Sequence, residues 1–350
     1  MYIMYIENIT AKSPEENLLK LGKILYLHES NGLPPEVCLP PEWWVNRIKF
    51  MKYQHSDTIY YTISAENRSV IGFMSLRTHK FRDTHRAGIE YYLLEPRQEY
   101  FIQLLRNSIS ELPDTVQDVE FWVHQSQQQD LVNWLAAINL QCSYTEIPTV
   151  LKLHHDEPEA IMEEADHLKM QAEQRGFRFQ FYLNNEIKHS DLFTFDDYCE
   201  VVAQVWNDMP REDSNWDDES VDGVRRYYED IETFPAKLQT NLLRIVAVHT
   251  ETGKPVGYSE VWLSPFIPEG IRHGDTGVIP EFRGNKLGMT MKMILYKKFL
   301  RDNPQTRYWI TANAESNTHM KAINTKMGHQ DLEKYYNYVV KADELRILVA

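Results

Sequence analysis

One stretch near the C-terminus restricts the fold of this chain more than any other. Residues Thr276 to Ile279 predict a short strand, and Pro280 ends it because proline has no N–H for a sheet ladder. A turn with two glycines follows over Arg283 to Gly288, and apolar residues then recur at helical spacing as far as Leu300. A strand, a glycine turn and a helix N-terminus direct free backbone N–H groups at one point. The sequence therefore predicts a phosphate or pyrophosphate site there.

A second motif follows the first along the chain. Arg307 to Ala312 predicts another strand, and Asn313 to Asn317 leads into a helix that ends near Gly328. Ser316 is the expected N-cap of this helix, and glycine is common just past a helix end. The two motifs in this order resemble the GNAT acyltransferase superfamily, and the resemblance covers residues 245–340.

The resemblance implies an acetyl-CoA site in this part of the chain. The glycine turn is similar to the pyrophosphate loop of the family, and the segment before the last helix is similar to its second cofactor-contacting element. The implied cofactor-binding residues are Thr276, Gly277, Val278, Ile279, Arg283, Gly284, Asn285, Lys286, Leu287, Gly288, Asn313 and Asn317. Two positions depart from the family pattern. Lys286 stands where the loop often has its middle glycine, and Asn324 stands where the last helix often has a tyrosine that acts as general acid.

The order of elements around these motifs occurs twice in the chain. Ile71-Gly72-Phe73 corresponds to Val256-Gly257-Tyr258 in a predicted β-hairpin, and a strand that ends at a proline follows each at similar spacing. Phe121-Trp122-Val123 then corresponds to Tyr308-Trp309-Ile310. Shared order with shared spacing indicates an internal repeat. The predicted fold is α/β (α+β), with two tandem GNAT-like domains, each a mixed, mostly antiparallel sheet flanked by helices.

The repeat also predicts which half of the chain binds the cofactor. Aligned on the repeat, Glu99 and Tyr100 occupy the places of Arg283 and Gly284. A carboxylate repels a pyrophosphate, and a side chain at the glycine position blocks close approach of the backbone. The chain is therefore expected to divide into a degenerate GNAT-like domain without a cofactor loop at 1–155, a linker helix at 156–176, and an acetyl-CoA-binding GNAT domain at 177–350.

The composition argues against several classes of protein. A net charge of −14 over 350 residues disfavours a nucleic-acid partner or an anionic membrane surface. No run of apolar residues is long enough to span a membrane, and the N-terminus lacks the basic segment of a signal peptide. Three widely separated cysteines indicate free thiols in a cytoplasmic protein. His154-His155-Asp156 has no spaced partner ligands, so no metal site is expected.

Acyl transfer from a thioester to an amine needs a donor to the carbonyl and a base for the amine. The Val278 N–H is the candidate donor, because the family strand before the loop exposes an N–H toward the thioester. Glu260 is the favoured base, since family members often use a glutamate near this place, directly or through water. Asp275 and His273 are the alternative candidates for the base. The alternative interpretation of Glu260 is an exposed strand glutamate without a catalytic role.

The departure at Asn324 leaves the general acid open. Tyr336 and Tyr338 lie in the last predicted strand, and Tyr338 is the candidate to protonate the thiolate. Aromatic packing on a sheet is the alternative interpretation of both tyrosines. Thiolate is a fair leaving group, so an acid is not obligatory.

The predicted function is a coenzyme-A-dependent N-acyltransferase that transfers an acetyl group from acetyl-CoA to a small primary amine by direct attack. The loop 207–219 carries Glu212, Asp213, Asp217, Asp218 and Glu219 beside the expected acceptor pocket, although such a run is often only a solvated face. Two alternatives are open. One is a non-catalytic acyl-CoA-binding module. The other is an aminoacyl-tRNA-dependent peptidyl transferase, which should lack the phosphate loop and carry basic surface.

Overall fold

The structure is a computed structural model that describes residues 4–50, 56–80, 83–153, 158–210 and 218–350. His154, His155 and Asp156, and the loop carboxylates Glu212, Asp213 and Asp217, lie outside these ranges. None of the helices in the described ranges is long and apolar enough to cross a lipid bilayer.

The N-terminal half of the chain, residues 4–153, begins with a short strand and a helical pair, and further strands and helices follow. Its elements are β1 (Tyr5–Ile9), α1 (Glu15–Ser30), η1 (Pro35–Val37), α2 (Pro41–Phe50), β2 (Ser56–Ser64), β3 (Val70–His79), β4 (Arg86–Leu93), α3 (Gln98–Ser110), β5 (Asp118–His124), α4 (Gln125–Trp134) and β6 (Gln141–Lys152).

The C-terminal half, residues 158–350, repeats this order. Its elements are α5 (Pro158–Gln174), β7 (Phe177–Leu183), η2 (Asn184–His189), α6 (Phe195–Asn207), α7 (Val221–Ile231), α8 (Phe234–Leu238), β8 (Asn241–His249), β9 (Pro255–Leu263), β10 (Gly270–Val278), η3 (Pro280–Phe282), α9 (Leu287–Asp302), β11 (Tyr308–Ala314), α10 (Thr318–Met327), β12 (Gln330–Asp331), β13 (Tyr335–Lys341) and α11 (Ala342–Val349).

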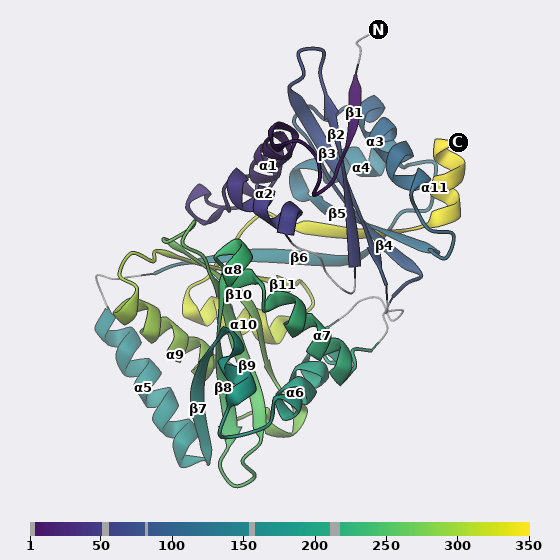
Figure 1. Cartoon of the computed structure of the whole chain (residues 1–350). Helices are drawn as coiled ribbons and strands as arrows, with labels where there is room; N and C mark the ends of the chain where they lie inside the picture. Colours follow the sequence, from purple (N-terminus) through teal and green to yellow (C-terminus); the bar gives the residue numbers. More distant parts are fainter. Residues whose placement is uncertain (1–3, 51–55, 81–82, 154–157, 211–217) are drawn as a thin grey trace.

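One continuous sheet runs through both halves, in the order β1-β2-β3-β4-β5-β13-β6-β11-β10-β9-β8-β7, with β12 also paired to β6. The two central strands cross between the halves. β6 comes before residue 155 in the chain, yet it pairs antiparallel with β11 of the C-terminal half. β13 comes near the C-terminus, yet it lies between β5 and β6. The C-terminal strand and α11 consequently pack with the N-terminal half, where both chain ends lie (Figure 1).

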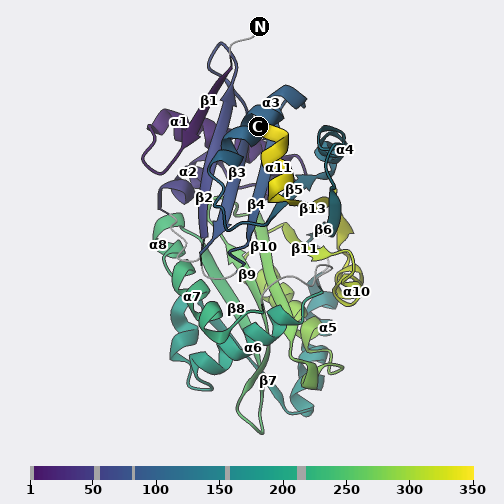
Figure 2. The same cartoon turned by 90° about the vertical axis from the view of Figure 1, so that its right-hand side faces the viewer.

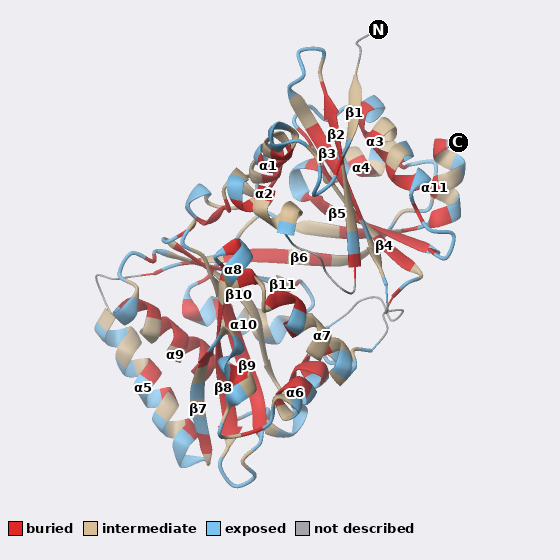
Figure 3. Cartoon of the chain, viewed as in Figure 1, coloured by how far each residue is buried: buried red, intermediate tan, exposed pale blue. Residues whose placement is uncertain are grey.

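Helices cover both faces of this sheet (Figure 2). One face carries α1, α2, α6, α7 and α8, whose apolar side chains form two core clusters with the strands. The other face carries α3, α4 and α11 over the N-terminal half and α5 and α9 over the C-terminal half. Buried residues concentrate along the strands and the inner sides of the helices (Figure 3).

Two strands separate in the C-terminal half. β10 and β11 are parallel and pair only over Gly270–Arg272 and Tyr308–Ile310. Beyond that point β11 continues along β6, while β10 continues along β9. A bulge interrupts β10 between His273 and Thr276, and bulges bend a strand away from its neighbour. A gap in the sheet opens there, directly before the glycine turn.

Candidate functional site

The glycine turn adopts the backbone that its sequence predicts. Gly284 has φ +82°, and a Cβ added there would meet nothing within 4 Å. Lys286 also has positive φ, at +60°, and α9 begins at the next residue. The first intrahelical backbone bond comes from the Thr290 N–H to the Lys286 carbonyl. The N–H groups of residues 287–289 come before that bond, so they are available to an anion at the positive end of the helix dipole.

A cleft of about 790 Å³ lies in front of these N–H groups. The glycine turn, the end of β10, the N-terminal part of α10 and the end of α6 form its walls. Nine of the predicted cofactor residues line it: Thr276, Gly277, Val278, Arg283, Gly284, Lys286, Leu287, Gly288 and Asn317. Its volume is in the range of small-molecule sites, and Lys286 and Lys326 place positive charge on its walls.

Three predicted cofactor residues do not line the cleft. The Ile279 N–H donates to the Val256 carbonyl at 3.0 Å, and the Asn285 side chain donates to the Phe282 carbonyl at 3.0 Å. Both residues therefore shape the turn from within. Asn313 lies on β11, and its side-chain nitrogen is buried with no hydrogen-bond partner in the described part of the chain.

Arg283 holds the turn against its neighbours. Its Nε donates to the Val278 carbonyl at 3.0 Å, and its guanidinium forms an ion pair with Asp208 at the end of α6. Asp208 also lines the cleft, so this pair closes one side of it. The sequence pattern did not predict Asp208 as a residue of the site.

Asn317 has a structural task as well as a place on the cleft wall. Its side chain accepts a hydrogen bond from the Met320 N–H at 3.1 Å, which makes Asn317 the N-cap of α10. This corrects the expectation for Ser316. Gly328 ends the helix with φ +94°, in the left-handed conformation typical of that position.

Glu260 lies on β9 and is 2 % exposed. Its Oε2 is 3.5 Å from Arg244 Nε and accepts a hydrogen bond from the Tyr228 hydroxyl at 3.4 Å. Burial raises the pKa of Glu260 to about 7, with Arg244 opposing the rise and Asp275 adding to it. On the neighbouring strand β10, Gly274 packs so closely that an added Cβ would lie 3.0 Å from Glu260 Oε1. Glu260 is thus a buried carboxylate beside the β10 bulge rather than an exposed strand residue.

The two alternative bases have fixed partners. Asp275 Oδ2 accepts a hydrogen bond from Trp206 Nε1 at 2.8 Å, and burial raises its pKa. His273 Nδ1 accepts from Trp309 Nε1 at 3.1 Å, so its Nε2 carries the proton toward the Thr276 hydroxyl at 2.7 Å. Burial also holds the pKa of His273 well below its usual range. His273 therefore has no free nitrogen with which to accept a proton.

Comparisons with known proteins place this arrangement among solved structures. No family model matches the chain, and no curated protein sequence matches it. A tandem GNAT protein from the clavulanic acid biosynthesis pathway, solved without acetyl-CoA, superposes with a TM-score of 0.71 at 17% identity, covering 97% of this chain and 99% of that one. A GCN5-related N-acetyltransferase from Sphaerobacter thermophilus gives 0.65 at 11% identity over 97% and 96%. The chain has the tandem GNAT fold.

A further solved structure contains the same fold inside a longer protein. The glucosamine N-acetyltransferase region of a fungal multi-domain β-N-acetylglucosaminidase gives a TM-score of 0.59 at 10% identity. The match covers 97% of this chain and 38% of that protein. The mixed, mostly antiparallel sheet and the internal repeat expected from the sequence are therefore confirmed as a tandem GNAT arrangement.

The two halves of the tandem GNAT fold differ at the turn. In the N-terminal half α3 begins at Gln98, so Tyr100 is inside the helix and 5 % exposed. Its N-cap, Arg97, has extended backbone, in contrast to Lys286 in the C-terminal half. The helix therefore starts where the C-terminal half has its glycine turn, and none of the residues just before α3 has a positive φ.

The exchanged strand corrects the placement of Tyr338. The sequence places it in the half that has the glycine turn, but β13 pairs with β5, and Tyr338 packs in the core of the other half. Its hydroxyl accepts a hydrogen bond from Gln128 of α4 at 2.5 Å. Tyr336 packs against the same core. Neither tyrosine lines the cleft, because β13 pairs with β5 of the N-terminal half. Strand pairing depends on long-range contacts, which the local sequence does not show.

A buried lysine contacts Asn324, the residue at the position where the GNAT pattern often has a tyrosine. Asn324 of α10 accepts a hydrogen bond from Lys292 Nζ of α9 at 2.8 Å, and both side chains are buried. Burial lowers the pKa of Lys292 to about 7. The sequence pattern did not predict this pair. Helical spacing places Lys292 next to the apolar positions of α9, and that spacing was the only signal available.

Proposed function

We propose that this protein is a coenzyme-A-dependent N-acyltransferase that transfers an acetyl group to a small primary amine. The observation that carries the proposal is the cleft at the gap between β10 and β11, with the unpaired N–H groups of α9 at one end. In this assignment the N–H groups of residues 287–289 and the Lys286 ammonium hold the pyrophosphate. Bound acetyl-CoA supplies the activated acetyl thioester.

The residues beside the gap stabilise the thioester oxygen and accept the proton of the amine. The Val278 N–H, at the end of β10, stabilises the negative charge that develops on the thioester oxygen. Glu260 accepts the proton of the attacking amine, directly or through water. A carboxylate with a pKa near 7 suits this task, because it is ionised at neutral pH yet basic enough to take a proton. Asp275, hydrogen-bonded to Trp206, is the second carboxylate beside the bulge.

Thiol release with a panel of primary amines tests the proposal. Wild-type protein should release coenzyme A in an amine-dependent manner and bind one acetyl-CoA per chain. The double variant Arg283→Glu with Gly284→Tyr gives the C-terminal half the residues of the N-terminal half, and it should abolish acetyl-CoA binding in calorimetry. Glu251→Gln, at an exposed hairpin turn, is the matched control and should behave as wild type.

Two results would contradict the proposal. Acetyl-CoA binding without thiol release for any amine would make the protein an acyl-CoA-binding module. Two equivalent binding sites per chain, or unchanged affinity in the double variant, would remove the cofactor assignment.

A further inference from the structure

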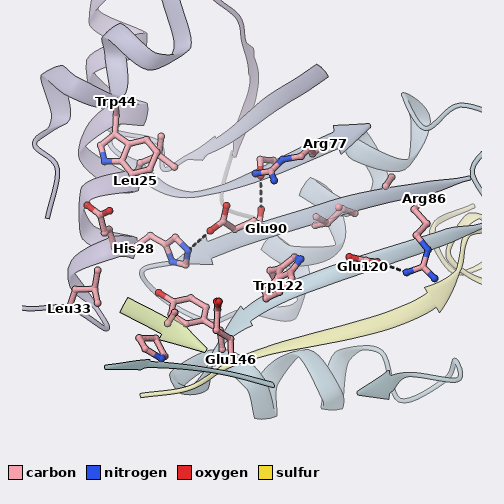
Figure 4. Close-up of a pocket in the computed structure, with 18 of the residues that line it drawn as sticks. Leu25, His28, Leu33, Trp44, Arg77, Arg86, Glu90, Glu120, Trp122 and Glu146 are labelled. Carbon is pink, nitrogen blue, oxygen red and sulfur yellow. Dashed lines mark hydrogen bonds and ion pairs between the residues drawn. The ribbon is translucent and has the colours of Figure 1, made fainter. Parts of the chain in front are cut away.

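A second large cavity, of about 490 Å³, lies where the two halves of the molecule meet. Its floor is the continuous sheet, with β3, β4 and β5 on one side and β6, β11 and β13 on the other. Helices α1 and α2 form a side wall. Figure 4 shows His28, Glu90, Trp122 and Glu146 around the same space, each from a different element. Neither half could form this cavity alone, because the exchanged strands supply part of its floor.

Most carboxylates of the cavity have fixed hydrogen-bond or ion-pair partners. Glu90 pairs with His28 at 2.9 Å, and Glu120 pairs with Arg86 at 2.7 Å. Glu29 pairs with the guanidinium of Arg272 at 2.6 Å. These side chains are therefore parts of fixed networks and have little attraction left for a ligand.

Glu146 is different. It lies on β6 opposite Ala314 of β11 and Tyr335 of β13, so it sits at the junction of the halves. Its carboxylate has no hydrogen bond or ion pair with any residue in the described ranges, and burial raises its pKa without an opposing charge. Arg77 also lines the cavity but is exposed to solvent. An uncompensated carboxylate in a partly buried site costs free energy that a bound cation would offset.

The walls around Glu146 suit an organic body. Trp122 and Tyr335 line the cavity together with Trp44, and Ile310 and Ala312 add aliphatic surface. Aromatic faces attract ammonium groups, and the apolar surface accommodates the carbon skeleton attached to them. A simple inorganic cation has no carbon skeleton that would cover the apolar part of these walls. The chemistry of the cavity therefore favours an amine with an apolar body.

The position of the cavity connects it to the proposed reaction. Ile310 is the last residue of β11 that pairs with β10, and Ala312 lies beyond that point, where the two strands have separated. The acetyl-CoA cleft includes Thr276 to Val278 on the other side of the same gap. A ligand in the cavity would thus border the gap from the β11 side.

We propose that the cavity between the halves is the acceptor subsite, which binds an organic amine as its ammonium form with Glu146 as the counter-ion. The proposal rests on the acyltransferase function above and specifies where its acceptor binds. Glu146 is a specificity residue in this scheme. It holds the ammonium form, and the base beside β10 removes the proton when the amine reaches the gap.

Calorimetry without acetyl-CoA tests the subsite directly. The ligands are phenethylamine, tryptamine and cyclohexylamine, with 2-phenylethanol and phenylacetate as the neutral and anionic counterparts of phenethylamine. At least one amine should bind, about 10-fold or more tighter than the alcohol, because a buried charge-assisted contact is involved. Glu146→Gln should weaken amine binding by about 10–100-fold and leave alcohol binding unchanged. Glu251→Gln, which removes an exposed carboxylate, should bind all ligands as wild type does.

The subsite is refuted if none of the three amines binds, if the alcohol binds as tightly as its amine, or if Glu146→Gln retains wild-type affinity. Steady-state kinetics then separate this outcome from failure of the proposed function. Glu146→Gln should raise the KM for the amine about 10-fold or more and change kcat little. Charge-selective binding without thiol release supports the subsite and contradicts the acyltransferase. Thiol release with an unchanged KM supports the acyltransferase and overturns the subsite.

Discussion

At the residue scale, Glu260 combines burial with a cationic partner, and the balance between them sets its usefulness as a base. Burial raises the pKa of its carboxyl, while Arg244 keeps the charged form accessible. The Tyr228 hydroxyl adds a second contact and itself bonds to the Tyr198 hydroxyl at 3.0 Å. A carboxylate in such a network stays in one orientation, which suits a group that must meet a proton at a fixed place.

Glu260→Gln should reduce turnover by roughly 10²–10⁴-fold, the usual contribution of a general base. Only the ionised carboxylate accepts a proton, so wild-type kcat/KM should rise with pH up to about pH 7 and then level off. The variant should lack this rise, and its deficit should shrink at high pH, where the free amine is already deprotonated. A pH–rate profile of both proteins gives the measurement. Wild-type rates in the variant would exclude Glu260 as the base.

Lys292 is a second buried ionisable group, but its expected effect is on stability. Its folded-state pKa is about 7, below the ordinary value of a lysine, so the unfolded chain binds more protons between pH 7 and about 10. Stability contributed by this group therefore rises with pH across that window. From pH 7 to pH 9 wild type should gain about 2 kcal/mol relative to Lys292→Met, which has no titrating group.

Urea unfolding of both proteins at the two pH values measures this difference. Equal pH dependence in wild type and Lys292→Met would show that the lysine keeps an ordinary pKa in the folded state. Lys297→Met is a suitable control, since that lysine is partly exposed and paired with Asp166.

At the scale of elements, Lys286 in the glycine turn has two opposing effects. Its backbone conformation is unfavourable, but its side chain places a positive charge beside the cleft. Lys286 has positive φ, which costs an L-residue about 1–2 kcal/mol. Lys286→Gly should therefore raise the free energy of unfolding by about 0.5–1 kcal/mol after the added chain entropy is subtracted. It should also weaken acetyl-CoA binding, because a positive charge near the pyrophosphate is lost.

The variant Lys286→Ala separates the two effects. Alanine removes the charge but keeps the unfavourable conformation, so it should weaken binding without stabilising the fold. Denaturation midpoints and calorimetric affinities of the three proteins give the comparison. A glycine variant that is no more stable than the alanine variant would contradict the assigned backbone cost.

At the scale of the whole molecule, the exchanged strands join the halves into one sheet. β13 bonds to β5 along one edge and to β6 along the other, and β6 bonds to β11. Unfolding either half would leave unpaired strand edges in the other. We therefore expect the two halves to unfold together, although the sequence separates them into consecutive segments.

Tyr338→Ala tests this coupling, since Tyr338 is 7 % exposed in the core of the N-terminal half. The variant should lose about 3 kcal/mol, as for other large aromatic truncations. Far-UV circular dichroism and loss of acetyl-CoA binding should then shift to the same lower urea concentration. Trp309→Ala, in the core of the C-terminal half, should move both signals together as well. Separate transitions for the two signals would show that the halves unfold independently.

Features that depend on neighbouring residues were predictable from the sequence. Pro280 ends a strand, Gly284 permits a positive φ and the apolar spacing after Leu287 forms a helix, so the turn and most residues of its cleft follow from local chemistry. The repeated order of these local elements was sufficient to predict the tandem fold. Serine and asparagine are both favoured N-caps, so the local sequence could not decide between Ser316 and Asn317. In the structure Asn317 is the cap.

Features that depend on strand partners required the tertiary structure. The alternation of apolar and polar residues in β13 is the same beside any neighbour, so the sequence could not show that Tyr338 faces the N-terminal core. For the same reason it could not show that Glu146 opens into a cavity between the halves, or that Arg244 meets Glu260. Hydrogen-bond ladders accept any strand with free edges. Long-range packing and burial therefore determine which strands pair. The strand pairing in turn determines the surroundings of each ionisable group.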